Sequence, residues 1–133
     1  MSEVHEGGCL CGAVRYKVEG NLRDVLECHC TMCRKTHGHV AAYTAVSKAA
    51  LEMTDATGLR WYGSSDKARR GFCGTCGSSL FWDPTGKDYI AVAAGTLDAP
   101  TGLKTVLQIH TADAGDYYTV RPDVPGRPHG SAG

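Results

Sequence analysis

Hydrophobic and polar residues alternate in short runs along much of this 133-residue chain. The clearest run is AVRYKVE at 13–19, where Val14, Tyr16 and Val18 are separated by charged residues. Because successive side chains of a strand point to opposite faces, this run predicts a half-buried strand. Further runs with strand-like composition lie at 24–28, 39–46, 51–54, 59–63, 68–73, 79–83, 88–95 and 106–111.

Helical patterns are confined to two stretches of one or two turns, at 31–36 and 47–50. The strands predicted at 68–73 and 79–83 flank the tetrapeptide CGTC, which indicates a β-hairpin with this motif at its tip. The chain also holds 17 glycines, which suits short strands joined by tight turns better than a helical bundle. The pattern therefore predicts a mainly β protein of short antiparallel strands.

The chain has the length of one ordinary domain, and no linker or repeat divides it. We expect residues 1–120 to form this domain. The segment 121–133 holds three of the five prolines, so we expect it to be a flexible tail.

Charge and hydropathy argue against several classes of function. Acidic and basic residues number 14 each, so nothing indicates a polyanionic partner such as nucleic acid. No apolar run approaches the roughly 18 residues that a membrane helix needs. The first residues, MSEVHEGG, show neither the basic nor the apolar region of a secretory signal. We therefore expect a cytoplasmic protein with reduced thiols and with no membrane partner.

The seven cysteines fall into three groups with the spacing of metal ligands. They are Cys9 and Cys11 in a CxC, Cys28, Cys30 and Cys33 in a CxCxxC, and Cys73 and Cys76 in a CxxC. Residues i and i+2 of a strand share a face, so a CxC can offer two sulfurs to one ion. A CxxC followed by glycine forms a turn that aims both thiolates at one ion. An odd, dense set of cysteines in a reducing compartment indicates metal binding or catalysis before disulfides.

Tetrahedral zinc takes four sulfur ligands, so seven cysteines divide into four plus three. Spacing alone does not decide which groups share a metal ion. It also leaves open free structural cysteines, disulfides, and an iron or iron–sulfur site, although the spacings do not match the ferredoxin runs. Zinc is the interpretation that accounts for all three groups together.

Four motifs carry a resemblance to a known family. In chain order they are GGCLCGAVRY, CHCTMCRK, GFCGTCGSSL and AAGTLD, within a stretch from about Gly7 to Tyr118. In this order they resemble the glutathione-dependent formaldehyde-activating enzymes, a family that also includes centromere-protein-V-like members. The resemblance implies a single-domain β-tent of short antiparallel strands around two zinc sites.

The resemblance also implies which cysteines share each ion. It assigns a structural zinc ion to Cys9, Cys11, Cys73 and Cys76, and a second zinc ion to Cys28, Cys30 and Cys33 as the catalytic residues. The implied reaction adds glutathione to formaldehyde to give S-(hydroxymethyl)glutathione. In the reverse direction this is a carbon–sulfur lyase reaction.

The chemistry of three thiolate ligands points the same way. Zinc with three protein ligands keeps a position for water or substrate. A zinc ion with three thiolate ligands lowers the pKa of bound water only weakly, but it binds a soft sulfur ligand well. A substrate thiol bound there as thiolate is nucleophilic. We therefore expect a zinc-dependent lyase that acts on the adduct of an aldehyde and a small thiol such as glutathione.

A fourth protein ligand at the triplet would instead favour a non-catalytic, zinc-stabilised binding module of the same fold. His29 is the nearest candidate, but between two ligating cysteines it should face the other way, so we expect a packing or surface role. His37 and His39 could fold back as ligand or proton shuttle, or do neither. Arg34 and Lys35 could steady a thiolate or meet a substrate carboxylate, although a solvated pair is the more ordinary explanation.

The remaining patterns predict structure only. Trp61, Tyr62, Phe81 and Trp82 lie at strand positions and are expected in the core. The charged run at 67–70 is expected to form a solvated strand face.

Overall fold

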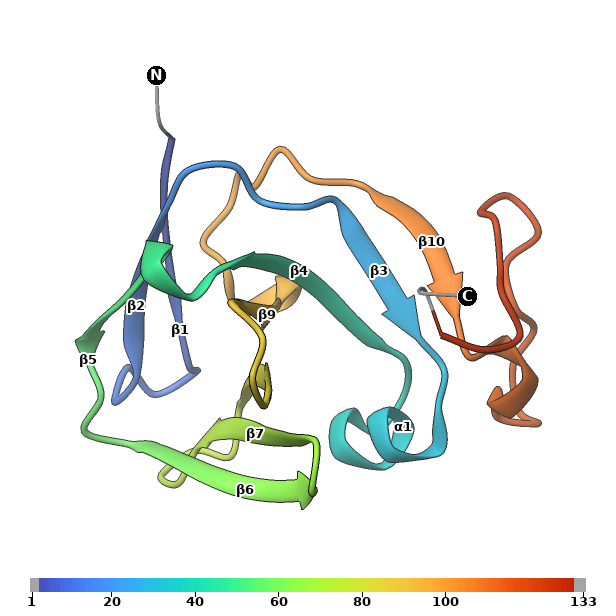
Figure 1. Ribbon diagram of the computed structural model, residues 1–133, viewed down its shortest axis with the longest axis horizontal. Helices are drawn as coiled ribbons and strands as arrows, with labels where there is room; N and C mark the ends of the chain where they lie inside the picture. The colour runs from blue at the N-terminus through green and yellow to red at the C-terminus, as the bar shows by residue number, and fades with distance from the viewer. Residues whose placement is uncertain (1–2, 131–133) are drawn as a thin grey trace. The chain divides into compact units, whose positions relative to one another are not determined.

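The computed structural model describes residues 3–130 (Figure 1). These residues form many short strands and little helix, which confirms the mainly β class. The chain divides into two compact units, each built from two separate stretches. The first unit comprises Met1–Arg23 and Thr44–Gly102, and the second comprises Asp24–Tyr43 and Leu103–Gly133.

Three antiparallel strands form one sheet of the first unit, with β2 in the middle. They are β1 (Val4–Gly8), β2 (Arg15–Glu19) and β5 (Leu51–Asp55). The register places Tyr16 of β2 opposite Gly7 on one side and Met53 on the other. Tyr16 and Val18 are buried while the charged residues between them are not, so the alternation predicted here is confirmed.

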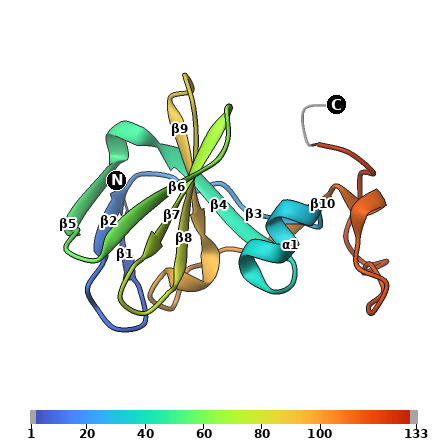
Figure 2. The same ribbon diagram turned by 90° about the horizontal axis from the view of Figure 1, so that it is seen from below.

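Four more strands of the first unit lie next to one another (Figure 2). In spatial order they are β6 (Leu59–Ser65), β7 (Ala68–Cys73), β8 (Ser79–Pro84) and β9 (Tyr89–Ala93). β7 and β8 pair antiparallel, with Gly71 opposite Phe81, and the CGTC motif forms the turn between them. The predicted hairpin is therefore confirmed.

The core of the first unit is mostly aromatic and aliphatic. Tyr16 and Phe81 are both 1% exposed, and their rings meet edge-on with centroids 5.4 Å apart. Trp61 stacks on Phe81 at 6.1 Å. Because the Thr96 hydroxyl donates to the Ala93 carbonyl at 2.7 Å, the Tyr16 hydroxyl donates to Thr96 Oγ1, also at 2.7 Å. The buried phenol is thus satisfied inside the core.

In the second unit, β3 has a partner on each side. The strands are β3 (Val25–Cys28), β10 (Thr105–Ile109) and β4 (Ala41–Ser47), whose residues from Thr44 onward belong to the first unit. β3 pairs antiparallel with β4 but parallel with β10. A parallel pair needs a long crossover connection, and here it includes most of the first unit. The local sequence pattern predicted only antiparallel strands and could not reveal this pair.

The one α-helix among the described residues is α1 (Thr31–His37), close to the predicted helix at 31–36. Its N-cap is Cys30, whose sulfur accepts a hydrogen bond from the Cys33 amide at 3.3 Å. Gly38 ends it with φ 78°, a left-handed conformation that favours glycine, and its amide donates to the Arg34 carbonyl. Three 3₁₀ turns complete the helical elements of residues 3–130: Lys48–Ala50, Ala94–Thr96 and Thr111–Asp113.

The segment after β10 returns to hydrogen-bond with that strand. The Gln108 amide donates to the Pro125 carbonyl at 2.9 Å, and the Arg127 amide donates to the Gln108 carbonyl at 2.8 Å. The His110 amide donates to the His129 carbonyl at 2.8 Å. The flexibility expected for 121–133 stays a prediction, which amide hydrogen exchange would test.

Three local features differ from the sequence-based expectation. β1 was not predicted because two of its five residues are glycine. Arg70 is only 6% exposed, because strand alternation places it on the same face as buried Ala68. Tyr62 is 64% exposed on the outer strand β6, so it is not a core residue. No helix within residues 3–130 is long and apolar enough to cross a membrane.

Candidate metal centre

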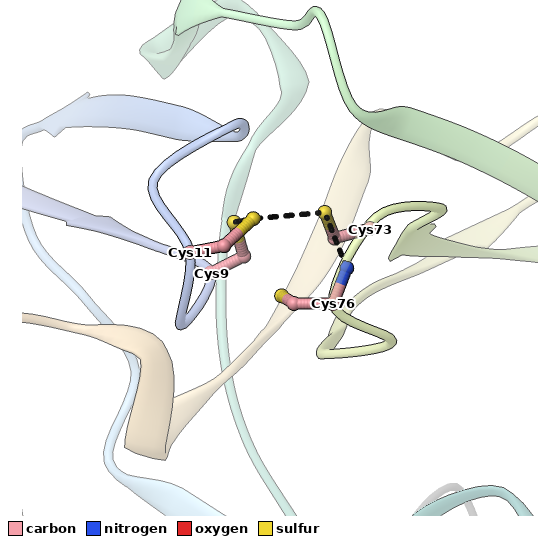
Figure 3. Close-up of side chains that lie close together, drawn as sticks. All are labelled: Cys9, Cys11, Cys73 and Cys76. Carbon is pink, nitrogen blue, oxygen red and sulfur yellow. Dashed lines mark hydrogen bonds between the residues drawn. The ribbon is translucent and has the colours of Figure 1, made fainter.

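Four cysteines of the first unit converge with their sulfurs facing one another (Figure 3). They are Cys9, Cys11, Cys73 and Cys76, and all four sulfurs lie within 4.8 Å of one another. The sulfur of Cys11 lies 3.7 Å from that of Cys9 and 3.8 Å from that of Cys73. A tetrahedral zinc ion bonded to sulfur at 2.3 Å requires sulfurs about 3.8 Å apart. The cluster therefore has dimensions that fit zinc.

Two tight turns position these sulfurs. Cys9 and Cys11 lie in the turn between β1 and β2, where the Val14 amide donates to the Cys9 sulfur at 3.2 Å. Cys73 ends β7, and the turn after it closes at Gly77, which has φ 85° and donates to the Cys73 carbonyl at 2.8 Å. The expectation that the CxC pair projects from one face of a strand is wrong. Turn geometry, not strand alternation, brings the two sulfurs together.

The surrounding backbone favours thiolates in this cluster. The amides of Cys76 and Thr75 donate to the Cys73 sulfur, both at 3.4 Å. The Cys76 amide lowers the pKa of Cys73 most, and it outweighs the effect of burial. Hydrogen bonds from the Ser78 hydroxyl and amide lower the pKa of Cys76 to about 5. Metal ligands must be deprotonated, so these bonds prepare the sulfurs of Cys73 and Cys76 for a cation. At Cys11 the backbone hydrogen bond with Ala13 acts in the same direction, but burial and hydrogen bonds with the neighbouring thiols outweigh it and raise the pKa to about 11.

A glycine allows the main chain to approach this cluster closely. The Gly74 amide donates to the Gly58 carbonyl at 2.7 Å, which draws the turn before β6 against the CxxC. A Cβ atom at position 58 would lie 2.9 Å from the Cys73 sulfur and 2.8 Å from the Ala13 side chain. Glycine is therefore the residue that fits there without displacing a sulfur.

The other three cysteines form a separate cluster in the second unit. Their sulfurs also lie within 4.8 Å of one another, and no fourth Cys, His, Asp or Glu among residues 3–130 joins them. Cys28 ends β3, Cys30 caps α1 and Cys33 lies in its first turn. Cys28 and Cys33 are buried, whereas Cys30 is half-buried. Here too the CxC pair spans a strand end and a helix cap, so its placement within a strand was wrong.

Within this cluster the pKa values of Cys28 and Cys30 shift in opposite directions. Hydrogen bonds from Cys28 and Cys33 lower the pKa of Cys30 to about 2. The same interactions with Cys30 and Cys33, together with burial, raise the pKa of Cys28. Metal binding at this cluster must therefore release the remaining thiol protons.

Neither ring nitrogen of His29 is available to a metal ion. Nδ1 lies 2.6 Å from the Tyr118 hydroxyl, and Nε2 lies 3.3 Å from Gln108 Oε1. The side chain is buried, with 3% exposed, so the packing role expected for it fits this arrangement.

His37 and His39 also pair with tyrosine hydroxyls. His37 Nε2 lies 2.7 Å from Tyr43 Oη, and His39 Nδ1 lies 2.6 Å from Tyr117 Oη. Neither joins the cysteine cluster within the described residues.

Arg34 lies next to Cys33 and is half-buried, and its Nε is buried with no hydrogen-bond partner among residues 3–130. Lys35, by contrast, is exposed.

The residues that contact His29 between two of these cysteines come from far along the chain and were not predicted. Gln108 and Tyr118 contact His29 across 79 and 89 residues, so no local pattern could indicate them. His110 also lies close enough to Cys30 to contribute, as the smallest of several effects, to lowering its pKa. His110 has a φ of 56°, unusual for a residue other than glycine. Its position at the end of β10 was the only available signal.

Comparison with known proteins supplies the family. The family model of the glutathione-dependent formaldehyde-activating enzymes matches residues 4–113, most of the chain. The chain belongs to this family. The suspected resemblance is therefore confirmed.

Two relatives and one solved structure are also similar to the chain. A Halomonas elongata protein with the provisional name of a glutathione-dependent formaldehyde-activating enzyme is 27% identical over 71% of the chain and 66% of its own length. A Schizosaccharomyces pombe protein named as an uncharacterized lyase is 28% identical over 86% of the chain and 83% of its own length. A crystal structure of a Rhodobacter sphaeroides protein shares the fold, with a TM-score of 0.60 and 24% identity over 91% of this chain and 98% of that one.

Proposed function

We propose that the protein is a zinc-dependent lyase that forms and cleaves the adduct of a small thiol, such as glutathione, with an aldehyde, such as formaldehyde. The observation that carries the proposal is the division of seven cysteines into a cluster of four and a cluster of three. Membership of the formaldehyde-activating family and a relative named as a lyase support the reaction class.

The two clusters would have different roles. Cys9, Cys11, Cys73 and Cys76 would hold a structural ion, because four sulfurs complete a tetrahedral shell. Cys28, Cys30 and Cys33 would hold the ion at which substrate binds. Zinc bound there supplies a coordination position and favours the thiolate form of an incoming thiol.

The remaining chemistry requires no further reagent. The thiolate sulfur adds to the carbonyl carbon of the aldehyde, so a C–S bond forms and the carbonyl oxygen takes up a proton. In the reverse direction the hydroxyl loses that proton, the C–S bond breaks, and thiol and aldehyde are released. The engagement of His29, His37 and His39 with Gln108 and tyrosine hydroxyls supports a coordination position free for substrate.

Arg34 is our candidate for recognising a carboxylate on the thiol substrate. Arg34 follows Cys33 in the chain and is half-buried, and its Nε is buried with no hydrogen-bond partner within residues 3–130. A charge-assisted hydrogen bond is worth about 1.5–3 kcal/mol, so Arg34→Gln should raise KM about 10- to 100-fold for glutathione. The adjacent, exposed Lys35→Gln is the matched control and should change KM little.

Exchange NMR spectroscopy of glutathione and formaldehyde tests the reaction directly. The wild-type protein should accelerate their exchange with S-(hydroxymethyl)glutathione above the spontaneous rate. Cys30→Ser should return exchange to that rate while the chain stays folded and retains one zinc ion.

A negative result in this test has two possible explanations, a different substrate or a protein that is not an enzyme. A wild-type protein that does not accelerate exchange would exclude glutathione with formaldehyde as substrates. Cobalt substitution would then show whether other small thiols change the sulfur-to-cobalt charge-transfer bands. If no thiol changes them because a protein group fills the fourth position, the chain is a non-catalytic, zinc-stabilised binding module.

A further inference from the structure

We propose that His29 is a positioning residue for the three-cysteine cluster, held in place by Gln108 and by Tyr118 of the C-terminal segment (residues 114–130). Its effect on zinc affinity rests on the cluster being a metal site, as proposed above, whereas the orientation of the three sulfurs depends neither on a bound ion nor on the identity of the substrate. It makes the C-terminal segment part of the machinery that orients the sulfurs.

The position of His29 in the chain couples its backbone conformation to the placement of two cysteine ligands. It lies between Cys28 and Cys30, so its main chain joins their main chains directly. Its amide donates to the Ile109 carbonyl at 3.0 Å, which ties this backbone to β10. Any rotation of the His29 backbone would move both neighbouring sulfurs.

Gln108 determines which ring nitrogen of His29 carries the proton. Gln108 is 1% exposed, and its Nε2 donates to the Arg121 carbonyl at 2.9 Å and to the Val124 carbonyl at 3.1 Å. These two bonds fix the amide orientation, so Oε1 is the atom that faces His29. A carbonyl oxygen can only accept, and therefore His29 Nε2 is the donor.

Tyr118 completes the arrangement on the other side of the ring. In the neutral tautomer with a proton on Nε2, Nδ1 of His29 accepts, so the Tyr118 hydroxyl donates to it at 2.6 Å. The two rings stack with centroids 5.5 Å apart, and His39 packs edge-on against Tyr118 at 4.7 Å. Both nitrogens of His29 are thus held by side chains that cannot exchange roles.

These hydrogen bonds lie partly outside the part of the chain that matches the family model. The match ends at residue 113, whereas Tyr118, Arg121 and Val124 follow it. Outer hydrogen bonds that orient metal ligands typically change metal affinity 10- to 100-fold when removed. Here the effect would pass through the main chain between two ligands.

Paired phenylalanine substitutions test the proposal, with zinc alone as the probe. Tyr118→Phe keeps the ring but removes the hydrogen bond to His29. Competition with a chelator should show zinc bound about 10- to 100-fold more weakly at the three-cysteine cluster and unchanged at the four-cysteine cluster. Tyr117→Phe removes a hydroxyl of the same segment, bonded to His39, and should leave both affinities unchanged.

A double-mutant cycle measures the coupling between His29 and Tyr118 in zinc affinity, which general destabilisation of the protein would not produce. His29→Phe keeps a planar ring but removes the acceptor for Tyr118, so combining it with Tyr118→Phe should add little further loss. Nitrogen-15 NMR of the wild-type ring should show a proton on Nε2 and none on Nδ1. Fully additive losses, or a proton on Nδ1, would overturn the proposal.

Protein that holds zinc only at the four-cysteine cluster separates this proposal from the proposed function. If the wild-type chain binds zinc at that cluster only, the proposed function fails, and thiol alkylation then decides the present proposal. Iodoacetamide should modify Cys28 and Cys30 several-fold faster in Tyr118→Phe than in Tyr117→Phe. Equal zinc affinities of the three-cysteine cluster, or equal alkylation rates in protein that holds zinc only at the other cluster, would overturn the positioning role.

Discussion

The first unit buries large apolar side chains, among them Tyr16, Leu80 and Phe81, whereas the buried residues of the second unit are mainly polar or cysteine. Beside the sulfurs, the second unit buries His29 and Gln108 and only a few apolar side chains such as Val25. The first unit can therefore be stabilised by removing apolar surface from water. The second depends more on hydrogen bonds within its interior.

The two sulfur clusters also differ in the groups that contact them. The cluster of four has a complete set of ligands for a tetrahedral ion, and backbone amides surround its sulfurs. In the cluster of three, the residue between Cys28 and Cys30, His29, bonds to side chains that come from far along the chain. The difference fits the proposal that the cluster of four is structural, whereas the cluster of three lies in a unit whose buried residues are more polar.

Loss of a scaffold ligand should have the largest effect. Structural zinc contributes on the order of 10 kcal/mol, comparable with the whole stability of a domain, so Cys73→Ala should leave the chain largely unfolded. Cys33→Ala should remain folded and bind one zinc ion fewer. Guanidinium unfolding measures the stability of the two variants, and metal analysis measures their zinc content. If both variants unfold equally and both lose both zinc ions, the two clusters do not have different roles.

Truncating the apolar core of the first unit should have the next largest effect. Phe81→Ala leaves a cavity beside Tyr16 and Trp61 and should lower the free energy of unfolding by about 3–5 kcal/mol. Val25→Ala, in the second unit, removes two methyl groups and should cost about 1.5 kcal/mol. Urea unfolding of the zinc-loaded proteins compares them, and equal losses would contradict the proposed difference in how the units are stabilised.

Adding a methyl group to that core should cost less. A Cβ atom on Gly71 would lie 2.9 Å from Trp61 and 3.0 Å from Phe81, so Gly71→Ala should destabilise by about 1–3 kcal/mol. Gly63, in the neighbouring strand, has no atom within 4 Å of the corresponding position, so Gly63→Ala is the control. Thermal unfolding should give a lower melting temperature for Gly71→Ala than for Gly63→Ala. Equal melting temperatures would show that Trp61 and Phe81 can move to accommodate the added methyl group.

Breaking the ion pairs of Asp83 should have the smallest effect. Its carboxylate lies 2.8 Å from both Lys48 Nζ and Arg69 Nε. Burial alone would raise the pKa of Asp83, but the hydrogen bonds from these two cations outweigh it, so this pKa is lowered. We expect Asp83→Asn to cost less than about 1 kcal/mol at neutral pH.

The pH dependence checks the sign of this contribution. A lowered folded-state pKa gives stability that is fully present above the unfolded value of about 3.9 and is lost as the pH falls through the folded value. The stability difference between wild type and Asp83→Asn should therefore vanish in acid. A difference that grows as the pH falls would contradict the assignment.

Local patterns predicted the elements of the first unit well. The alternation around Tyr16 and the hairpin around CGTC depend on residues close together in the chain, and both form as predicted. Cysteine spacing, with the family resemblance, predicted the same two groups of sulfurs that the structure brings together. The roles and the metal identity of these groups stay predictions.

What the sequence could not reveal depends on long-range contacts. Strand alternation failed for the CxC pairs, because Cys9 and Cys30 lie at turns and caps whose geometry depends on backbone hydrogen bonds. The parallel pairing of β3 with β10, and the contacts that Tyr118 and Gln108 make with His29, join residues about 80 or more positions apart. No local periodicity encodes such pairs.

The discontinuity of both units has a consequence for synthesis on the ribosome. Cys28, Cys30 and Cys33 are made long before β10 and before Tyr118, whose hydroxyl bonds to His29. All four cysteines of the other cluster also precede β10 in the chain. Nascent chains should therefore be able to finish the four-cysteine cluster first and to close the region around the three remaining thiols only after β10 and Tyr118 have emerged, so that chaperones or metal donors could reach these thiols until then.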